Sequence, residues 1–443
     1  MVHFDLKKSV GARLVIMAVI AGMLLIPSSM ISRIINERES RRNEAVAEVV
    51  SKWAGKQTVC GPVLTVPYST KSRDSSGKYV AGSDGNIQIL PESLHVSGIV
   101  NPEIRYRGIY EVVVYGAKIK MNGTFNKPDL RSLNIEESAV KWKDASLTLG
   151  ISDLKGIKEP IRIDFNAGPY MASPGTMTPV VESGVSTAVP VDAARETQEF
   201  RTEIMLDGSE ELNFVPVGKE TIVDLKSGWE NPSFIGGFLP LSREIHKDGF
   251  AAIWKVFNLN RKFPQVWIFG KYDLSESAFG VGLCLPVDGY QTATRTNKYA
   301  LLFIVLTFLA FFLAEISGKR PIHPLQYLLI GAAQVLFYIL LLSLTEHMAF
   351  AWAYLISSVA LVSLVSLYSI SVLKNRKSTS IISVLLALLY LYLYIVLQMQ
   401  DYALLLGSIG LFGILGGVMF ITRHIDWFAL FSSRRAGTEE IDI

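Results

Sequence analysis

Residues 299–316 read YALLFIVLTFLAFFLAEI, an apolar run whose one charged residue, Glu315, stands next to its end. A helix that crosses the roughly 30 Å hydrocarbon layer of a membrane needs about 20 mostly apolar residues. This run therefore predicts a membrane-spanning helix. Four similar runs follow it and one precedes it near the start of the chain. The six predicted spans are residues 14–31, 299–316, 325–345, 348–373, 380–399 and 402–422.

The composition supports this division of the chain. Half of the 443 residues are apolar and only 19% are charged, whereas a soluble protein carries about 25% charged residues. The charge deficit lies in the spans, because residues 32–298 have the texture of an ordinary globular domain. The net charge of +3 and the lack of a basic stripe argue against nucleic-acid binding.

Lys and Arg lie at alternate ends of the spans. They occur in the N-terminal flank 1–13, in the loops after the second and fourth spans, and in the tail 423–443, whereas the two remaining short connections have none. The positive-inside rule then places both termini in the cytoplasm and residues 32–298 outside it. The first span could also be a cleaved signal peptide. Its 18 apolar residues exceed the usual 7–15, and no small-residue cleavage site follows, so an anchor is favoured.

The domain outside the membrane begins with helical spacing and continues as strands. Residues 33–54 predict a helix that continues or follows the anchor. From residue 57 onward, β-branched runs alternate with turn residues, and within the run 104–125 we expect a turn at Gly116-Ala117. Many short strands with few helices predict a sandwich or a pair of packed sheets. One large core or two smaller ones are both compatible with this length. The predicted fold class is therefore a membrane protein with one N-terminal spanning helix, a β-rich outer domain and a five-helix C-terminal bundle over residues 299–422.

Motifs of catalysis and metal binding are missing from the sequence. It contains no zinc-protease, phosphate-loop, nucleophile-elbow or paired Cys-x-x-Cys motif. The six histidines are scattered, without the i, i+4 spacing that would place two on one helix face. We therefore expect no enzyme, no cofactor and no metal site.

Polar residues within the predicted bundle are the first candidate functional sites, because charges in a bilayer are costly. Glu315 lies near Lys319, Arg320 and His323 in the sequence, so it is either part of an ion pair at the headgroup level or part of a proton or substrate relay. Gln334 lies deeper in the third span. An amide there more often forms a hydrogen bond between helices than a transport site.

A second set lies at the outer ends of the spans. The two short outer connections contain Glu346 with His347 and Asp401, and the chain re-enters the membrane through Arg295 and Lys298. Opposite charges at one depth beside a hydrocarbon layer are expected to pair. We therefore predict that Glu346 or Asp401 forms a salt bridge with Arg295 or Lys298. The alternative is that each charge faces water.

Small residues are frequent in two of the spans. The fourth span carries six serines, and the sixth carries Gly407, Gly410, Gly413, Gly416 and Gly417. Small residues at helical spacing favour close approach of helix backbones, so we interpret both sets as packing positions. The tyrosines at 390, 392 and 394 alternate at period two and so cannot share one helix face.

Two features of the outer domain remain. Cys60 and Cys284 both lie in strand-like runs outside the cytoplasm, so they either form a disulfide or stay free, with a lone strand cysteine typically buried. Trp229, Phe234 and Phe238 lie in an aromatic, turn-rich segment that is either a binding surface or a part of the core, the core being the commoner role for aromatics.

Several long blocks resemble the CreD family of bacterial inner-membrane proteins. They are GPVLTVPY (61–68), RYRGIYEVVVYGAKIKMNGTF (105–125), WENPSFIGGFLP (229–240), VDGYQTATRTNKYALLFIVLTFLAFFLAE (287–315), HPLQYLLIGAAQVLFYILLLSLTEH (323–347), AYLISS (353–358) and QDYALLLGS (400–408). The resemblance spans almost the whole chain. It implies a Gram-negative inner-membrane protein that is associated with a two-component regulatory system, with envelope integrity and with tolerance of envelope stress.

The resemblance implies a compartment and a phenotype but not a reaction. We expect a non-enzymatic protein whose periplasmic domain binds an envelope protein or a lipid, with the bilayer itself as a partner. The alternatives are a transporter or flippase whose path runs through the bundle and, third, a membrane-embedded enzyme. The lack of inverted repeats and broken helices argues mildly against transport. The sequence leaves the oligomeric state open.

Overall fold

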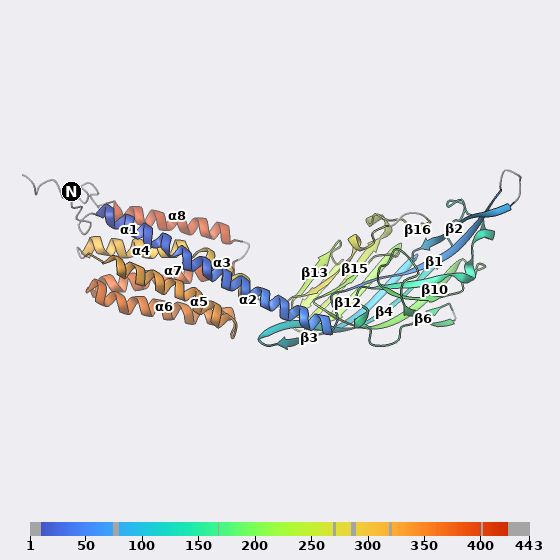
Figure 1. Cartoon of the computed structure of the whole chain (residues 1–443), viewed down its shortest axis with the longest axis horizontal. Helices are drawn as coiled ribbons and strands as arrows, with labels where there is room; N and C mark the ends of the chain where they lie inside the picture. The colour runs from blue at the N-terminus through green and yellow to red at the C-terminus, as the bar shows by residue number, and fades with distance from the viewer. Residues whose placement is uncertain are drawn as a thin grey trace, which may run out of the picture. The chain divides into compact units, whose positions relative to one another are not determined.

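The structure is a computed structural model of the whole chain. It describes residues 10–73, 79–166, 168–268, 272–284, 289–318, 321–399 and 402–423. The chain forms two compact units, and many of their elements are labelled in Figure 1. The membrane unit comprises Met1–Arg41 and Val287–Ile443, and the β unit comprises Arg42–Pro286.

Among the described residues, six helices are long and apolar enough to cross a membrane, as the sequence predicted. Five of them follow the β unit, after a short polar helix α3 (Gly289–Lys298). Their bounds are α4 Ala300–Gly318, α5 Pro324–Thr345, α6 Phe350–Leu373, α7 Arg376–Gln398 and α8 Ala403–Thr422. Aromatic and aliphatic side chains of α4 to α7 form the core of this unit, together with the apolar face of the first span.

The first span and the helix predicted after it form one nearly continuous run. Helix α1 (Val10–Met23) is separated from α2 (Leu25–Lys52) by the single turn residue Leu24. Pro27 lies in the first turn of α2, where a missing backbone N–H and a fixed φ are tolerated. Ile31 and Ile35 are each 1% exposed, so the apolar stripe of the anchor continues beyond the predicted end of the span.

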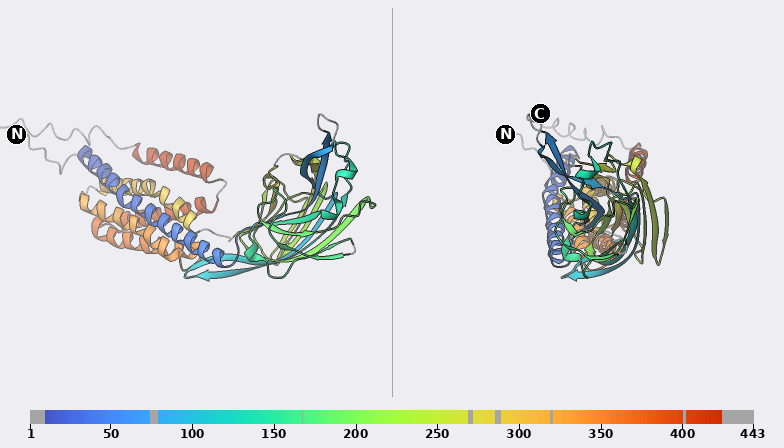
Figure 2. Two further views of the ribbon diagram at one scale, coloured as in Figure 1. Left: turned by 45° about the vertical axis from the view of Figure 1, so that its right-hand side comes forward. Right: turned by 90° about the vertical axis from the view of Figure 1, so that its right-hand side faces the viewer.

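Helix α8 lies at the edge of the bundle in both views of Figure 2, and no residue of its apolar stretch Leu405–Thr422 is buried. A Cβ added at Gly410 would meet the ring of Tyr392 on α7. Added at Gly407, Gly413, Gly416 or Gly417, it would have no neighbour within 4 Å in the described part of the chain. The packing predicted for this glycine row is therefore wrong for four of its five members, because α8 contacts the bundle mainly through α7.

The β unit consists of two mixed sheets, which confirms the predicted pair of packed sheets. The nine-stranded sheet has the order β13-β17-β11-β1-β5-β9-β8, with β2 pairing β1 and β16 pairing β2; the eight-stranded sheet has the order β14-β15-β12-β3-β4-β10-β6-β7. The strands of the first sheet are β1 Gln57–Arg73, β2 Tyr79–Ile89, β5 Ser146–Ile151, β8 Ser173–Pro174, β9 Gly184–Ala188, β11 Glu211–Phe214, β13 Pro232–Gly236, β16 Val266–Trp267 and β17 Phe279–Leu283. Those of the second are β3 Ser93–Arg107, β4 Tyr110–Asn126, β6 Arg162–Phe165, β7 Gly168–Met171, β10 Thr197–Ser209, β12 Glu220–Ser227, β14 Ser242–His246 and β15 Gly249–Phe257. Buried side chains of both sheets form one core.

The hairpin of β3 and β4 shows how the strands follow from the sequence. Along the first half of β3, buried and exposed residues alternate as expected for a strand with one face on a core. The turn falls at Gly108, whose φ of 62° is a left-handed conformation that glycine adopts without strain. Gly116-Ala117, where we expected the turn, lies inside β4 and pairs with β3 and β10 on either side. The predicted position was wrong because glycine also occurs inside strands, so its presence alone does not mark a turn.

Candidate functional site

Glu315 is the most deeply buried acidic residue among the described residues of the membrane unit, with 4% of its surface exposed. It lies near the end of α4, and its Oε1 forms an ion pair with Arg13 of α1. The Tyr327 hydroxyl of α5 donates to its other oxygen at 3.0 Å. Both oxygens are thus satisfied by partners from two other helices. The arrangement agrees with the ion-pair interpretation, with Arg13 as a partner that the sequence did not indicate.

His323 and Gln326 cap α5. The backbone N–H of Leu325 donates to His323 Nδ1 at 3.2 Å, and the backbone N–H of His323 donates to Gln326 Oε1 at 2.9 Å. Such reciprocal bonds satisfy N–H groups that lack a partner at a helix start. In the structure, His323 therefore stabilises the start of α5. Lys319 and Arg320, its neighbours in the predicted cluster, lie outside the described residues.

Gln334 joins α5 to α4. Its Nε2 donates to Thr307 Oγ1 at 2.5 Å and to the Phe303 carbonyl at 3.4 Å. The predicted hydrogen bond between helices is confirmed. The Oε1 atom of Gln334 is buried and has no hydrogen-bond partner among the described residues, and the same is true of the Tyr338 and Tyr390 hydroxyls.

Two polar links hold α2 within the membrane unit. Asn297 of α3 donates to the Ser28 carbonyl at 3.0 Å and to Ser32 Oγ at 2.8 Å. Arg38 Nε lies 3.6 Å from Glu346 Oε1, in the connection between α5 and α6. Asn297 and Arg38 were both missed in the sequence, because their partners are distant along the chain and neither residue lies in a predicted span.

The charges at the outer ends of the spans are paired differently from the prediction. Glu346 pairs with Arg38 instead of with Arg295 or Lys298, neither of which has an ion-pair partner in the described part of the chain. Helix α2 continues without a break to Lys52 and places Arg38 beside Glu346, a partner that lies in no predicted span. His347 is exposed. Asp401 lies outside the described residues, so its pairing with Arg295 or Lys298 stays a prediction.

The aromatic segment of the β unit lies at the edge of the core. Phe234 of β13 packs edge-on against Phe250 and Trp254, with ring centroids 5.9 and 5.6 Å apart. Phe238 packs edge-on against Phe279 at 5.9 Å, and the Trp229 indole donates to the Cys284 carbonyl at 3.1 Å. All three predicted aromatics are partly buried against the core. The geometry agrees with the core interpretation.

The two cysteines are free thiols, so the structure does not contain the disulfide considered from the sequence. Cys60 is buried in β1, where desolvation raises the pKa of its thiol to about 12. Cys284 follows β17 and is exposed. The Cys60 side chain packs against Gly150 of the neighbouring strand β5, inside the sheet.

The end of α2 is held by charged side chains of the β unit. Arg107 of β3 makes two hydrogen bonds of 2.9 Å to Glu48, and Lys52 makes a third of 2.8 Å. Hydrogen bonds first from Lys52 and then from Arg107 lower the pKa of the Glu48 carboxyl. The Trp53 ring, one residue beyond α2, lies 5.0 Å from the Arg105 guanidinium and 4.9 Å from Lys158 Nζ. Such cation–π contacts contribute modestly at an exposed position.

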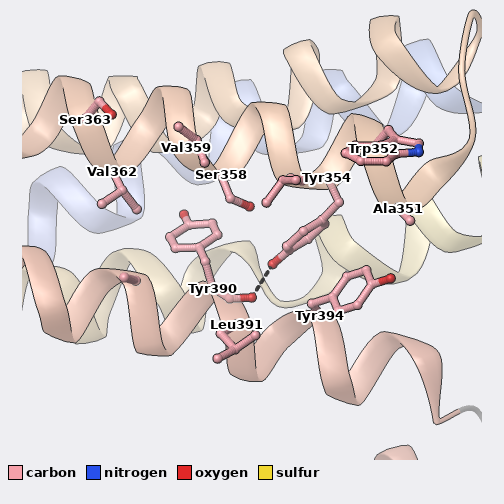
Figure 3. Close-up of a pocket in the computed structure, with 12 residues that line it drawn as sticks. Ala351, Trp352, Tyr354, Ser358, Val359, Val362, Ser363, Tyr390, Leu391 and Tyr394 are labelled. Atoms are coloured by element: carbon pink, nitrogen blue, oxygen red, sulfur yellow. Dashed lines mark hydrogen bonds between the residues drawn. The ribbon is translucent and has the colours of Figure 1, made fainter.

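A groove of about 530 Å³ lies between α6 and α7 (Figure 3). Tyr354, Ser358 and Val359 of α6 and Tyr390, Leu391 and Tyr394 of α7 are among its lining residues. The Tyr354 hydroxyl crosses the groove to donate to the Tyr390 carbonyl at 2.7 Å. Two of the α6 serines that we interpreted as packing positions, Ser358 and Ser363, line this groove. The signal for it was the spacing of Tyr390 and Tyr394 by four residues, which places both on one helix face.

No group of three or more His, Cys, Asp or Glu side chains in the described ranges is arranged to hold a metal ion. Arg13 and Arg38 form ion pairs that tie α1 and α2 to the bundle. Gln334 joins α5 to α4, and His323 caps α5. The chain is thus a multi-pass membrane protein whose first helix is fixed in a bundle and whose β unit is inserted between the first and second spans.

The comparisons with known proteins agree with this class. Residues 9–428 match the profile of the family described as inner membrane protein CreD. The chain is similar to the inner membrane protein CreD of Escherichia coli (strain K12), with 33% identity over 429 residues, which cover 95% of this chain and 94% of the relative. The chain belongs to the CreD family of inner membrane proteins.

Proposed function

We propose that the protein is a non-enzymatic support of the cell envelope whose β unit binds an envelope protein or lipid outside the cytoplasm. In this proposal the membrane unit anchors the β unit and transmits its state through α2. The distribution of Lys and Arg supports an outer location for the β unit, and the resemblance noted above supports a role in tolerance of envelope stress.

The single observation that carries the proposal is that one end of α2 is held in the membrane unit and the other end in the β unit. Within the membrane unit, Ser28 and Ser32 bond to Asn297, and Arg38 pairs with Glu346. Within the β unit, the other end of the same helix is held through Glu48 and Arg107. One unbroken helix therefore contributes fixed residues to both units. A change that reorients one end of a helix is carried to the other end, because its backbone hydrogen bonds resist bending.

The test breaks α2 between its two sets of contacts. Ser40 is exposed and lies between Arg38 and Glu48. Ser40→Pro removes one backbone hydrogen bond and makes the ring clash with the preceding turn, at about 3 kcal/mol. Ser40→Ala leaves the helix intact and serves as the matched control. Both variants are expressed in cells that lack their own copy, and survival under detergent or β-lactam stress is measured.

We expect Ser40→Pro to lose protection at normal membrane abundance, and Ser40→Ala to retain it. Full protection by the Ser40→Pro variant, at normal abundance and with correct insertion, would overturn transmission through α2. Thermal unfolding of both purified variants shows whether the two units remain folded.

The groove between α6 and α7 bears on the transporter or flippase alternative. Its lining contains hydroxyl and apolar side chains but no charged one. Such a surface suits an apolar chain better than an ion or a charged solute. The groove therefore supports binding of lipid over passage of a polar substrate.

A further inference from the structure

The groove between α6 and α7 occupies one half of the helix pair. Helices α6 and α7 are joined by Lys374 and Asn375, and the groove lies toward the opposite end, from Ala351 to Ser363 on α6 and from Ala387 to Tyr394 on α7. At 1.5 Å per residue, Trp352 and Ser363 are about 17 Å apart along the helix axis. Trp352 is 64% exposed. A Trp at a span end is typical of the membrane–water interface, so the groove extends from the interface toward the middle of the bilayer.

The rim of the groove is open to hydrocarbon. Leu355 and Val359 on α6 and Leu391 on α7 are 51%, 56% and 56% exposed. Apolar side chains at this depth face lipid tails. Any occupant that enters between the two helices from the side therefore meets an apolar surface first.

The floor of the groove holds polar atoms that lack partners. Tyr390 is 1% exposed, and its hydroxyl has no hydrogen-bond partner among the described residues. The Ser358 Oγ atom, across the groove on α6, is also buried and has no hydrogen-bond partner among the described residues. Figure 3 shows the Tyr390 ring directed from α7 toward α6 beside Ser358. A hydroxyl that is removed from water without a hydrogen bond costs free energy, and lipid tails cannot supply one.

The polar atoms continue behind Tyr390. The side chain of Gln334 approaches the Tyr390 hydroxyl, yet Gln334 Oε1 has no hydrogen-bond partner in the described ranges, and the Tyr338 hydroxyl has none either. The groove thus combines an apolar entrance with hydroxyl donors at its floor. Its volume of about 530 Å³ falls within the range of ligand pockets.

We propose that this groove is a binding site for one acyl chain of an ester-linked bilayer lipid. The glycerol end lies beside Leu355, and the ester carbonyl accepts hydrogen bonds from the Tyr390 and Ser358 hydroxyls. From there the chain continues deeper along Val359 and Val362. The lipid headgroup stays at the Trp352 end, because no charged side chain lines the groove. This site is independent of the function proposed above, which rests on α2 and the β unit.

The experiment uses the full-length protein in vesicles of phosphatidylethanolamine and phosphatidylglycerol. A small fraction of phosphatidylcholine carries a photoreactive diazirine on one ester-linked chain, and cross-linked peptides are mapped by mass spectrometry. We expect cross-links to concentrate on residues 351–363 and 387–394. The same probe with an ether-linked chain lacks the carbonyl and so loses both hydrogen bonds. Its cross-linking there should fall by at least roughly fivefold, the factor that one net hydrogen bond contributes.

Three variants and a control sharpen the test. Ala387→Trp fills the groove and should abolish cross-linking there, whereas Leu388→Trp, on the neighbouring 56% exposed position outside the groove, should leave it unchanged. Tyr390→Phe removes one of the two hydroxyl donors and should lower cross-linking by the ester probe. Tyr390→Phe combined with Ser358→Ala removes both donors and should bring the ester probe down to the level of the ether probe.

Even labelling of all lipid-facing helices, α8 included, would show ordinary annular lipid and overturn the site. Equal labelling by the ester and ether probes in the unaltered protein would overturn the role of the hydroxyls. This second comparison needs no substitution, so it decides the proposal even if Ala387→Trp fails to fold.

Discussion

Glu315 illustrates, at the scale of the residue, how a charge is kept inside a bundle. Its side chain is 3% exposed, whereas that of Arg13 is 25% exposed. The carboxylate has lost most of its hydration, and Arg13 and Tyr327 replace it. Removing one member of a buried ion pair leaves the other without compensation, which costs more than the pair itself contributes.

We predict that Glu315→Gln lowers the free energy of unfolding of the membrane unit by about 3 kcal/mol. Glu37→Gln is the matched control, because Glu37 pairs with Arg41 on an exposed helix face, where such a pair contributes about 0.5 kcal/mol or less. Denaturant unfolding in detergent micelles measures both. Equal effects of the two substitutions would contradict the buried-pair interpretation.

The cost of burying polar groups is also what made Glu315 and Gln334 recognisable in the sequence. Their partners were not recognisable. Arg13 is 302 residues from Glu315 along the chain, and nothing in the two local sequences links them. Thr307 lies within an apolar run, and nothing in that run shows that its hydroxyl bonds to Gln334. Single residues thus revealed where polar contacts are needed, whereas the contacts depend on helix packing.

At the scale of the element, α1 is fixed against the bundle by shape as well as by charge. Gly331 of α5 faces the end of α1, and a Cβ at this position would lie 2.2 Å from Leu24 Cδ1 and 3.0 Å from the Phe308 ring. A side chain at residue 331 would therefore displace the anchor helix.

We expect Gly331→Leu to destabilise the membrane unit by about 1–3 kcal/mol through overpacking. The control is Gly413→Leu in α8, where a new Cβ meets nothing within 4 Å among the described residues. Thermal unfolding in detergent compares the two. Leu24→Ala should recover part of the loss in the Gly331 variant, and an equal loss with or without that second change would argue against the contact.

The contact of Glu48 with Lys52 and Arg107 predicts a dependence on pH. The pKa of this carboxyl is lowered in the folded state, so its contribution is complete above the unfolded pKa of about 4.3 and is lost as the pH falls through the folded pKa. The difference in unfolding midpoint between the unaltered protein and Glu48→Gln should therefore shrink from pH 7 to pH 3. Glu44→Gln, at an exposed position on the same helix, should show no such trend. A difference that is constant with pH would contradict the assignment.

Elements were predictable where the local pattern of apolar, polar and turn residues decides them. The six spans follow from apolar length, and the strands of the β unit follow from alternation and turn residues. Gly108, not Gly116, forms the turn between β3 and β4 because sequence does not distinguish a turn glycine from a strand glycine. The order of strands in the two sheets depends on pairings such as β1 with β11, which join residues about 155 positions apart.

At the scale of the whole molecule, the remaining question is which side of the membrane each part faces. Lys and Arg flank one set of span ends, which predicts an outer β unit. The two free cysteines provide natural probes within that unit. Cys284 is exposed, whereas Cys60 is buried and its raised pKa of about 12 keeps it protonated. The thiolate is the reactive form, so the two sites should differ in reactivity.

We predict that a membrane-impermeant maleimide added to intact spheroplasts labels Cys284 and leaves Cys60 unlabelled. In a Cys284→Ser background, the Asn375→Cys variant, altered in the connection between α6 and α7, should react only after the membrane is permeabilised. Peptide mapping identifies the labelled site in each case. The comparison separates two sources of protection: Cys60 should become reactive only when the β unit is unfolded, whereas the thiol introduced at position 375 should become reactive as soon as the reagent crosses the bilayer. Labelling of the Asn375→Cys variant in intact spheroplasts would reverse the orientation inferred from the charges, and with it the outer location on which binding of an envelope partner depends.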